Sequence, residues 1–501
     1  MNSNQVAIIG AGVSGLVTAK VLQGDGFDVS IFEKAPEVGG VWETSRAYPG
    51  LRTNSPYPLY AFSDFDHSES TDEFPTAGQI RGYLERYADH FGLRDHLNLE
   101  TEVVSVKQLP SEEEGQHPGF QVHTRDLTTG GPIRSRTFDF VVVCNGVLSE
   151  PHIPDFDGSR DFAGTILHSS QVQHADSLVG KRVLVIGAGK SALDCATLAG
   201  QVSDSCTLLF RKTYWMLPRY YGRTRVDKLI YSRWVEKLSY PPYHQSPLPE
   251  KLLRGLCTPL VSLFRRKQRQ FTIRATRMPG FMVPDMSIHD SIFHLGIGSD
   301  IYNHINSGQV HAVRSEIERF TGGHGIRLTN GEDMEADVVI CATGWKRNVD
   351  FLDRPLRETL APNGQLRLYR HILPPTEQRL GFVGYASSTN SPLTSEIAAH
   401  WLSQHFLGKL RLPNTRAMER SVERVLKWTA RHFPQQREGH FIGGYVAHYT
   451  DWLLRDMEVR QRRCPGLASE HLQPFRANRL RGLERERSHV SVDTGARGGA
   501  G

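Results

Sequence analysis

Short runs of apolar residues, each followed by a glycine-rich turn, punctuate this 501-residue chain. The apolar run 6–9 leads into such a turn, then into an amphipathic stretch and a β-rich segment over 29–33. The run 183–186 begins the same succession, which ends in a second strand over 207–211. A strand–turn–helix–strand unit that occurs twice predicts two parallel sheets, and therefore an α/β fold with two Rossmann-like domains.

Two further apolar runs, 140–143 and 338–341, each end close to a glycine and are typical of the last strand of such a unit. Their positions predict that the second domain is inserted into the first. The end of the chain, from Glu484, is polar and rich in glycine and is predicted to be disordered. The expected bounds are 1–165 for the first part of the first domain, 166–335 for the inserted domain, 336–460 for the second part of the first domain, and 461–501 for a polar tail.

The overall composition is that of a soluble globular protein, with 39% hydrophobic and 23% charged residues. A net charge of +5 gives no indication of nucleic-acid binding. The six cysteines include no Cys-x-x-Cys and no metal-ligand spacing, which predicts reduced thiols and no metal site. The N-terminus is too short and polar for a signal peptide, and no apolar run approaches the roughly 20 residues that cross a bilayer. We therefore expect a cytoplasmic protein, at most associated with a membrane surface.

One segment inside the second domain has a different character. Residues 214–275 contain thirteen Lys or Arg against three Asp or Glu, interleaved with Tyr, Trp and Leu. The prolines at 241, 242, 247 and 249 are expected to break any long helix here. The segment is interpreted as an insertion that forms a lid over the active site or a surface patch for anionic lipid. A solvated basic loop that attracts cofactor phosphates is an equally good interpretation.

The first glycine turn has the spacing of a dinucleotide site. Gly10 makes the tight turn, Gly12 lets the backbone approach a pyrophosphate, and Gly15 lets the helix pack closely on the strand. Glu33 ends the next strand, where an acid accepts hydrogen bonds from a ribose hydroxyl. This pattern predicts an FAD site, with binding residues Gly10, Ala11, Gly12, Val13, Ser14, Gly15, Glu33 and Lys34.

The second glycine turn differs at the positions that select the nucleotide. Ala192 replaces the third glycine, and Arg211 and Lys212 stand where the first unit has an acid. Two cations there favour a 2′-phosphate, so the pattern predicts NADPH, unless they are ordinary surface bases. The predicted binding residues are Gly187, Gly189, Lys190, Ser191, Ala192, Arg211 and Lys212.

A chain that holds FAD and NADPH together is typical of hydride transfer from the nicotinamide to the flavin. Disulfide reductases of this plan need a redox cysteine pair, which the sequence lacks. A quinone, a carrier protein or molecular oxygen then remains as the acceptor of the electrons.

Several motifs resemble the flavin-containing monooxygenases, the class B single-component enzymes. They are Gly39-Gly40-Val41-Trp42, the segment Phe162 to Gln171 with Gly164 and His168, the segment Arg211 to Arg219, Ala342-Thr343-Gly344, and Ser395-Glu396. The resemblance covers about 5–455 without the insertion. It implies that NADPH reduces FAD, that oxygen adds at flavin C4a as a hydroperoxide, and that one oxygen atom passes to a small organic substrate.

The same resemblance implies further residues at the cofactors. Asn54 matches an Asn that lies near the flavin and the nicotinamide in the family, and it is the candidate catalytic residue; the alternative is an Asx-turn ahead of Pro56. The other cofactor-binding residues that the resemblance implies are Gly40, Val41, Trp42, Thr53, Val104, Ala342, Thr343 and Gly344.

The sequence departs from the family where reaction type is encoded. Val172 stands where the nitrogen- and sulfur-oxygenating branch has Tyr or Phe and the Baeyer–Villiger branch has Trp. Asn54 stands where the Baeyer–Villiger branch has an Asp that supports a catalytic Arg, and Arg277 is a weak candidate for that Arg. The balance favours the flavin-containing monooxygenase branch and leaves nitrogen or sulfur oxygenation, hydroxylation and Baeyer–Villiger chemistry open. The alternatives are a flavin reductase that inserts no oxygen and a non-catalytic dinucleotide-binding protein.

Overall fold

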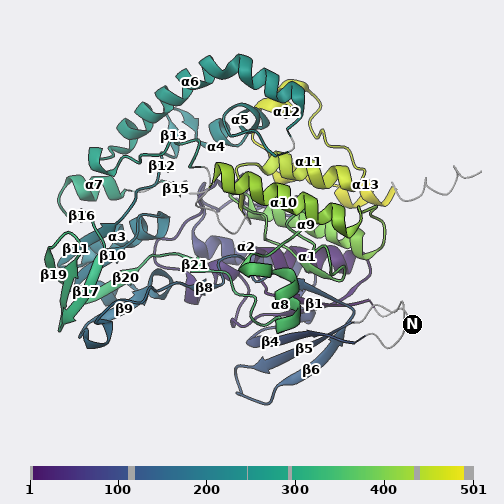
Figure 1. The fold of residues 1–501 in the computed structure, drawn as a ribbon, viewed down its shortest axis with the longest axis horizontal. Helices are drawn as coiled ribbons and strands as arrows, with labels where there is room; N and C mark the ends of the chain where they lie inside the picture. Colours follow the sequence, from purple (N-terminus) through teal and green to yellow (C-terminus); the bar gives the residue numbers. More distant parts are fainter. Residues whose placement is uncertain are drawn as a thin grey trace, which may run out of the picture.

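The computed structural model describes residues 4–110, 119–244, 246–291, 296–298, 300–433 and 441–489. Two five-stranded sheets organise these residues, and every strand pairing within them is parallel. Each sheet has helices on one face and a small antiparallel sheet on the other, and the two lie side by side (Figure 1). The predicted α/β fold with two Rossmann-like domains is confirmed.

The first sheet owes its two covered faces to the alternation of side chains along a strand. Val6 and Ile8 of its central strand pack with the helices, whereas Ala7 and Ile9 pack with the antiparallel sheet. The strand order is β22 (Leu380–Phe382), β7 (Phe140–Val143), β1 (Gln5–Ile9), β2 (Asp28–Phe32), β3 (Leu97–Asn98). The covering elements are α1 (Val13–Gly24), α2 (Ala77–His90) and α9 (Ser391–Phe406) on one face, with β4 (Thr101–Gln108), β5 (Phe120–Asp126), β6 (Arg134–Phe138) and α8 (Arg354–Leu360) on the other.

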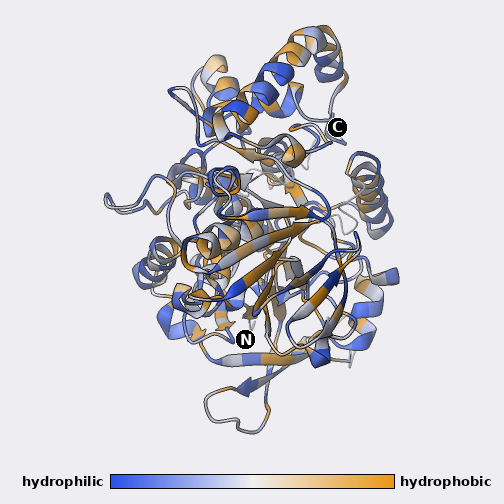
Figure 2. Cartoon of the chain, turned by 90° about the vertical axis from the view of Figure 1, so that its left-hand side faces the viewer, coloured by the Kyte–Doolittle hydropathy of each residue, from blue (hydrophilic) through white to orange (hydrophobic). Residues whose placement is uncertain are grey.

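The second sheet repeats this arrangement, and Figure 2 shows its apolar strands facing the viewer. Val183 and Val185 pack with α3 (Lys190–Val202) and α7 (Ile301–Asn306), and Leu184 packs with an antiparallel sheet. The strand order is β16 (His311–Arg314), β11 (Ser205–Phe210), β10 (Arg182–Ile186), β20 (Val338–Cys341), β9 (Thr165–His168). The antiparallel strands are β17 (Ile317–Gly322), β18 (Gly325–Leu328) and β19 (Asp333–Glu335). The strand β20 belongs to the second sheet because it pairs with β10. The expected domain boundary at 335/336 therefore separates β20 from the other strands of its sheet.

The basic insertion contains a long helix, so the expectation that its prolines prevent one is wrong. After β12 (Met216–Leu217), β13 (Tyr220–Tyr221), β14 (Thr224–Arg225), α4 (Asp227–Ile230) and α5 (Arg233–Leu238) comes α6 (Leu248–Thr276), a helix of 29 residues. Pro247 is its N-cap and Pro249 lies in its first turn, where the missing N–H costs no hydrogen bond. The helix arches over the top of the molecule (Figure 1).

The C-terminal segment is more ordered than its polarity predicts. It runs through α10 (Thr415–His432), α11 (Val446–Asp456), α12 (Leu467–Leu472) and α13 (Leu483–His489). Phe475, Leu480 and Leu483 are buried in the core of the first domain, and Arg487 forms an ion pair with Asp25. The expected disorder from Glu484 is therefore wrong up to residue 489, and residues 490–501 lie outside the described part. Short strands complete the fold at β8 (Glu150–Pro151), β15 (Gly296–Ile297), β21 (Trp345–Lys346), β23 (Ser387–Ser388) and β24 (Phe441–Gly443).

Candidate functional site

The first glycine loop turns directly after β1 and leads into α1. Gly10 has φ +108°, and its N–H donates to the carbonyl of Phe32 over 2.8 Å. A Cβ on Gly15 would lie 1.8 Å from the carbonyl oxygen of Gly10, and one on Gly12 would lie 3.3 Å from Cα of Gly40. Gly15 cannot carry a side chain and Gly12 has little room for one, so the N-terminus of α1 is left open to an anionic group.

A cavity of about 590 Å³ opens in front of this loop. Its lining comes from the carboxyl ends of β1, β2 and β7 and from the N-termini of α1 and α9. An open parallel sheet binds nucleotides at this edge. The predicted residues on the cavity wall are Gly10, Gly12, Val13, Ser14, Glu33, Lys34, Gly40, Val41 and Val104.

Other predicted residues of the first site lie behind this wall and support it. The N–H groups of Ala11 and Ala35 donate to the carboxylate of Glu33 over 2.8 and 2.9 Å, which fixes the acid in place. The buried Trp42 donates from Nε1 to the hydroxyl of Tyr60 over 2.7 Å, and Tyr60 lines the cavity. Ala11 and Trp42 therefore position groups on the wall.

Part of the cavity comes from residues outside the predicted cofactor-binding set. Ser391 and Ser395 line it from the first turns of α9, and the hydroxyls of Ser14 and Ser395 lie 3.0 Å apart. Gly384 has φ +92°, and a Cβ there would lie 2.3 Å from Oγ of Ser14. The Asn390-Ser-Pro start signal of α9 was available in the sequence, but its place beside α1 was not. Two helix N-termini and glycine-lined walls fit a long anionic dinucleotide such as FAD.

The second glycine loop has the same backbone geometry at β10. Gly187 has φ +129°, and a Cβ there would lie 2.6 Å from the carbonyl oxygen of Ala342. Gly189 is the N-cap of α3, and a Cβ there would meet no described protein atom within 4 Å. Ala192 is fully buried behind the turn. The open space at Gly189 leaves the N-terminus of α3 accessible, as a pyrophosphate site requires.

The charged residues of the second site differ in how they are engaged. Lys190 forms an ion pair with Asp194 one turn later, and Asp194 also accepts from the hydroxyl of Tyr48 over 3.0 Å. Arg211 follows β11 and is highly exposed, with Glu316 at 3.6 Å as its ion-pair partner. Lys212 beside it is exposed as well. The side chains of Arg211 and Lys212 are thus accessible to a ligand, whereas the charge of Lys190 is neutralised by Asp194.

The fingerprint histidine joins β9 to the loop after β20. His168 is fully buried; its Nδ1 accepts from the N–H of Ser170 over 3.2 Å, and its Nε2 donates to the carbonyl of Gly344 over 3.0 Å. Burial lowers the pKa of His168, which keeps the ring neutral in this tautomer. Its ring also packs edge-on against Trp345. This histidine has a structural role at the Ala342-Thr343-Gly344 loop, where Thr343 donates to the carbonyl of His152.

Asn54 lies between the first domain and the β12–β15 strand pair of the second domain. Its Oδ1 accepts from the N–H of Ile297 over 3.3 Å, and β15, which contains Ile297, pairs with β12. The flanking residues are fixed locally: Thr53 donates to the carbonyl of Ser55 over 2.8 Å, and Ser55 donates to that of Thr389 over 3.1 Å. Within the described residues the Nδ2 group of Asn54 makes no hydrogen bond, so a donor remains available there.

The described part of the chain contains neither a disulfide nor a cluster typical of a metal site. The six cysteines are free, and no group of three or more His, Cys, Asp or Glu there is placed to hold a metal ion. Cys144 lines the cavity, but burial raises the pKa of its thiol to about 12. The protonated thiol is a poor nucleophile, which agrees with the absence of a redox cysteine pair.

Comparison with known proteins decides which chemistry this pair of sites serves. The family model for flavin-binding monooxygenase-like proteins matches residues 3–460. This chain belongs to that family. It is 30% identical to the probable flavin-containing monooxygenase 1 of Arabidopsis thaliana, with 98% of this chain and 99% of that protein covered. It is 28% identical to the N-oxide-forming dimethylaniline monooxygenase 4 of Mus musculus, with 82% and 71% covered.

The fold is shared with solved structures of the same class. The NADP⁺-bound cyclohexanone monooxygenase of Rhodococcus sp. Phi1 superposes with a TM-score of 0.68 at 20% identity, covering 90% of this chain and 96% of that one. This flavin-binding monooxygenase is therefore an FAD- and NADPH-dependent oxidoreductase that inserts oxygen into a small organic substrate. The monooxygenase interpretation is confirmed over the reductase and non-catalytic alternatives.

Proposed function

We propose that this enzyme transfers oxygen to a nitrogen or sulfur atom of its substrate. The observation that carries the proposal is Asn54, a neutral amide with an available Nδ2 donor between the first domain and the β12–β15 strand pair of the second domain. A soft nucleophile such as an amine or a sulfide needs no protein base to accept oxygen. A neutral donor that shelters the oxygenating group from water is sufficient for that reaction.

The carbonyl reaction requires a different residue. Oxygenation of a ketone develops negative charge, which a nearby cation must offset. Arg277, the sequence candidate for that cation, is exposed at the C-terminal end of α6, where its carbonyl accepts from Asn306. Arg46 lines the cavity, but its guanidinium stacks on Trp345 at 4.6 Å and donates to the carbonyl of Leu148. The names of similar proteins include both reaction types. The mouse relative is named as N-oxide-forming, and the structural neighbour is named as a cyclohexanone monooxygenase.

The cofactor roles of the chain follow from the same geometry. Bound FAD, once reduced by NADPH, supplies the oxygen activation. We propose that Gly10, Gly12 and the N-terminus of α1 bind its pyrophosphate and that Glu33 binds its ribose. We assign the pyrophosphate of NADPH to Gly187, Gly189 and α3, and its 2′-phosphate to Arg211 and Lys212.

A product assay tests the proposed reaction. The holoenzyme is incubated with NADPH and ¹⁸O₂ together with N,N-dimethylaniline, methyl phenyl sulfide or cyclohexanone, and the products are identified by mass spectrometry. We expect an N-oxide or a sulfoxide that carries one ¹⁸O atom. A lactone from cyclohexanone, with no N-oxide or sulfoxide, would assign the enzyme to carbonyl oxygenation instead.

A further inference from the structure

The outward face of α6 is apolar, which is the reverse of an ordinary surface helix. Five leucines at intervals of three or four residues form a row on this face, which we name the leucine ridge. Their exposed fractions range from 52% to 82%, so each remains largely uncovered by the described part of the chain. The leucine ridge consists of Leu248, Leu252, Leu256, Leu260 and Leu263.

Polar contacts on the opposite face hold the helix in this orientation. Glu250 accepts from Ser246 over 2.6 Å and lies 3.4 Å from Nε2 of His448 in α11. Near the other end of the helix, the hydroxyls of Tyr221 and Thr272 lie 2.8 Å apart. These contacts fix the inward side of α6 against the protein, and the leucine ridge faces away from it.

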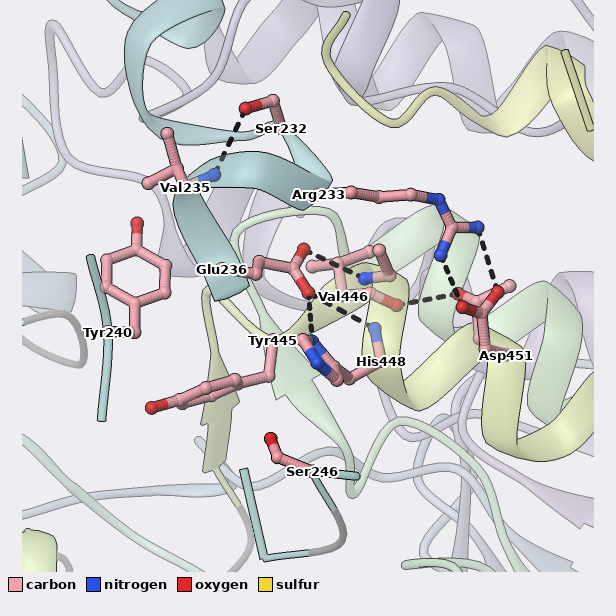
Figure 3. Close-up of polar contacts among 12 residues, drawn as sticks. Ser232, Arg233, Val235, Glu236, Tyr240, Ser246, Tyr445, Val446, His448 and Asp451 are labelled. Atoms are coloured by element: carbon pink, nitrogen blue, oxygen red, sulfur yellow. Dashed lines mark hydrogen bonds and ion pairs between the residues drawn. The ribbon is translucent and has the colours of Figure 1, made fainter. Parts of the chain in front are cut away.

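The anchor of α6 extends into the first domain. Figure 3 shows Glu236 of α5 bonded to His448, and Arg233 bonded to Asp451. His448 lies between Glu236 at 2.9 Å and Glu250 at 3.4 Å, so one residue of α11 binds both α5 and α6. The orientation of the leucine ridge is therefore fixed relative to the two sheets.

The exposed charges around the leucine ridge have one sign. The acid of α6, Glu250, is turned inward toward His448, whereas its exposed charged side chains are cations. These are Lys251, Arg266, Lys267, Arg269 and Arg274. Leucines flanked by lysines and arginines are the composition of helices that lie in the surface of an anionic membrane.

Exposed apolar side chains also lie on two helices near α6. α12 packs against α5, which packs against α6. Trp234 of α5 is 40% exposed, and Leu467 and Leu472 of α12 are 62% and 59% exposed. In Figure 1 these helices lie under the arch of α6.

We propose that α6 binds the surface of an anionic membrane, with the leucine ridge in the headgroup–acyl boundary and the flanking cations on lipid phosphates. The helix lies on the membrane and does not span it. No helix in the described part of the chain is long and apolar enough to cross a bilayer. The proposal does not depend on which atom the enzyme oxygenates.

The charge pattern favours lipid over a second copy of the chain. A two-fold interface places the same patch against itself. A dimer formed through α6 would bring the cations of the two copies, Lys251 and those over 266–274, close together, and α6 presents no exposed acid to offset them. Anionic headgroups supply that missing countercharge.

Vesicle sedimentation tests the proposal with the FAD-loaded full chain. We expect binding to phosphatidylcholine vesicles that contain phosphatidylglycerol, little binding to phosphatidylcholine alone, and release as salt is raised. Leu256→Glu/Leu260→Glu should weaken binding at least about tenfold, because two inserted apolar groups become charged. Arg266→Gln/Lys267→Gln should also weaken it about tenfold, because two phosphate contacts are lost.

Matched substitutions away from α6 serve as controls. Ile133→Glu alters a side chain that is 52% exposed on the β5–β6 turn, and Arg416→Gln/Arg420→Gln removes two exposed cations one turn apart on α10. Both should bind vesicles like the wild type. Equal binding by the leucine variant and the wild type would overturn the proposal. So would a concentration-dependent dimer in sedimentation velocity that the leucine variant loses, without vesicle binding.

Discussion

At the scale of single residues, the cations after β11 make the most direct prediction. Arg211 is highly exposed and its partner Glu316 lies 3.6 Å away, so its guanidinium is free to bind a phosphate. Arg211→Ala should raise the KM for NADPH about tenfold, the loss of one charge-assisted contact. The KM for NADH should change little, because NADH lacks the 2′-phosphate. Steady-state kinetics with both nucleotides check this, and an equal loss for both would refute the phosphate assignment.

Asn54 allows a test of its donor separately from its acceptor. Asn54→Asp keeps an oxygen for the N–H of Ile297 but removes the Nδ2 donor, whereas Asn54→Ala removes both. If the donor shelters the oxygenating group, both variants should raise the fraction of NADPH oxidation that ends as hydrogen peroxide by about tenfold. Peroxide and product yields give this fraction. Normal coupling in Asn54→Asp would limit Asn54 to its contact with Ile297.

At the scale of elements, a substitution in the second glycine loop should weaken NADPH binding without changing the stability of the fold. Gly189 has φ −75°, which any residue adopts, and a Cβ there would meet no described protein atom. Gly189→Ala should therefore leave the thermal midpoint unchanged while raising the KM for NADPH about tenfold or more, because the methyl group takes the place of the pyrophosphate. Gly78→Ala, in an equally open position of α2, is the control and should leave the KM for NADPH unchanged. Normal NADPH kinetics in Gly189→Ala would place the pyrophosphate elsewhere.

The same elements show how far sequence reasoning extends. Both glycine loops were predictable because their turns, helices and strands are contiguous in the chain, and so was Glu33 at its place on the cavity wall. Ser395 was noticed as a motif, yet its contact with Ser14 joins residues 381 positions apart, which no local pattern encodes. The helix α6 was missed because prolines were given the meaning they have inside a helix, whereas two of them lie at its start.

At the scale of the whole molecule, one of the contacts that join the insertion to the first domain depends on a buried titratable group, His448. Burial alone would lower the pKa of His448, but hydrogen bonds and charges from Glu236 and Glu250 raise it to about 9. In the unfolded chain a histidine titrates near its ordinary value of about 6.5. Protonation of His448 therefore stabilises the folded state, by roughly 3 kcal/mol below about pH 6.5.

This linkage predicts how stability depends on pH. Because the folded pKa is raised, the contribution of His448 is fully present below about pH 6.5 and is lost as the pH rises through about 9. His448→Gln should lower the thermal midpoint at pH 6.5, and its difference from the wild type should shrink toward pH 9.5. His174→Gln, at an exposed position, is the control. A difference that stays constant across this range would mean that His448 is neutral in the folded protein and joins α5 and α6 only by hydrogen bonds.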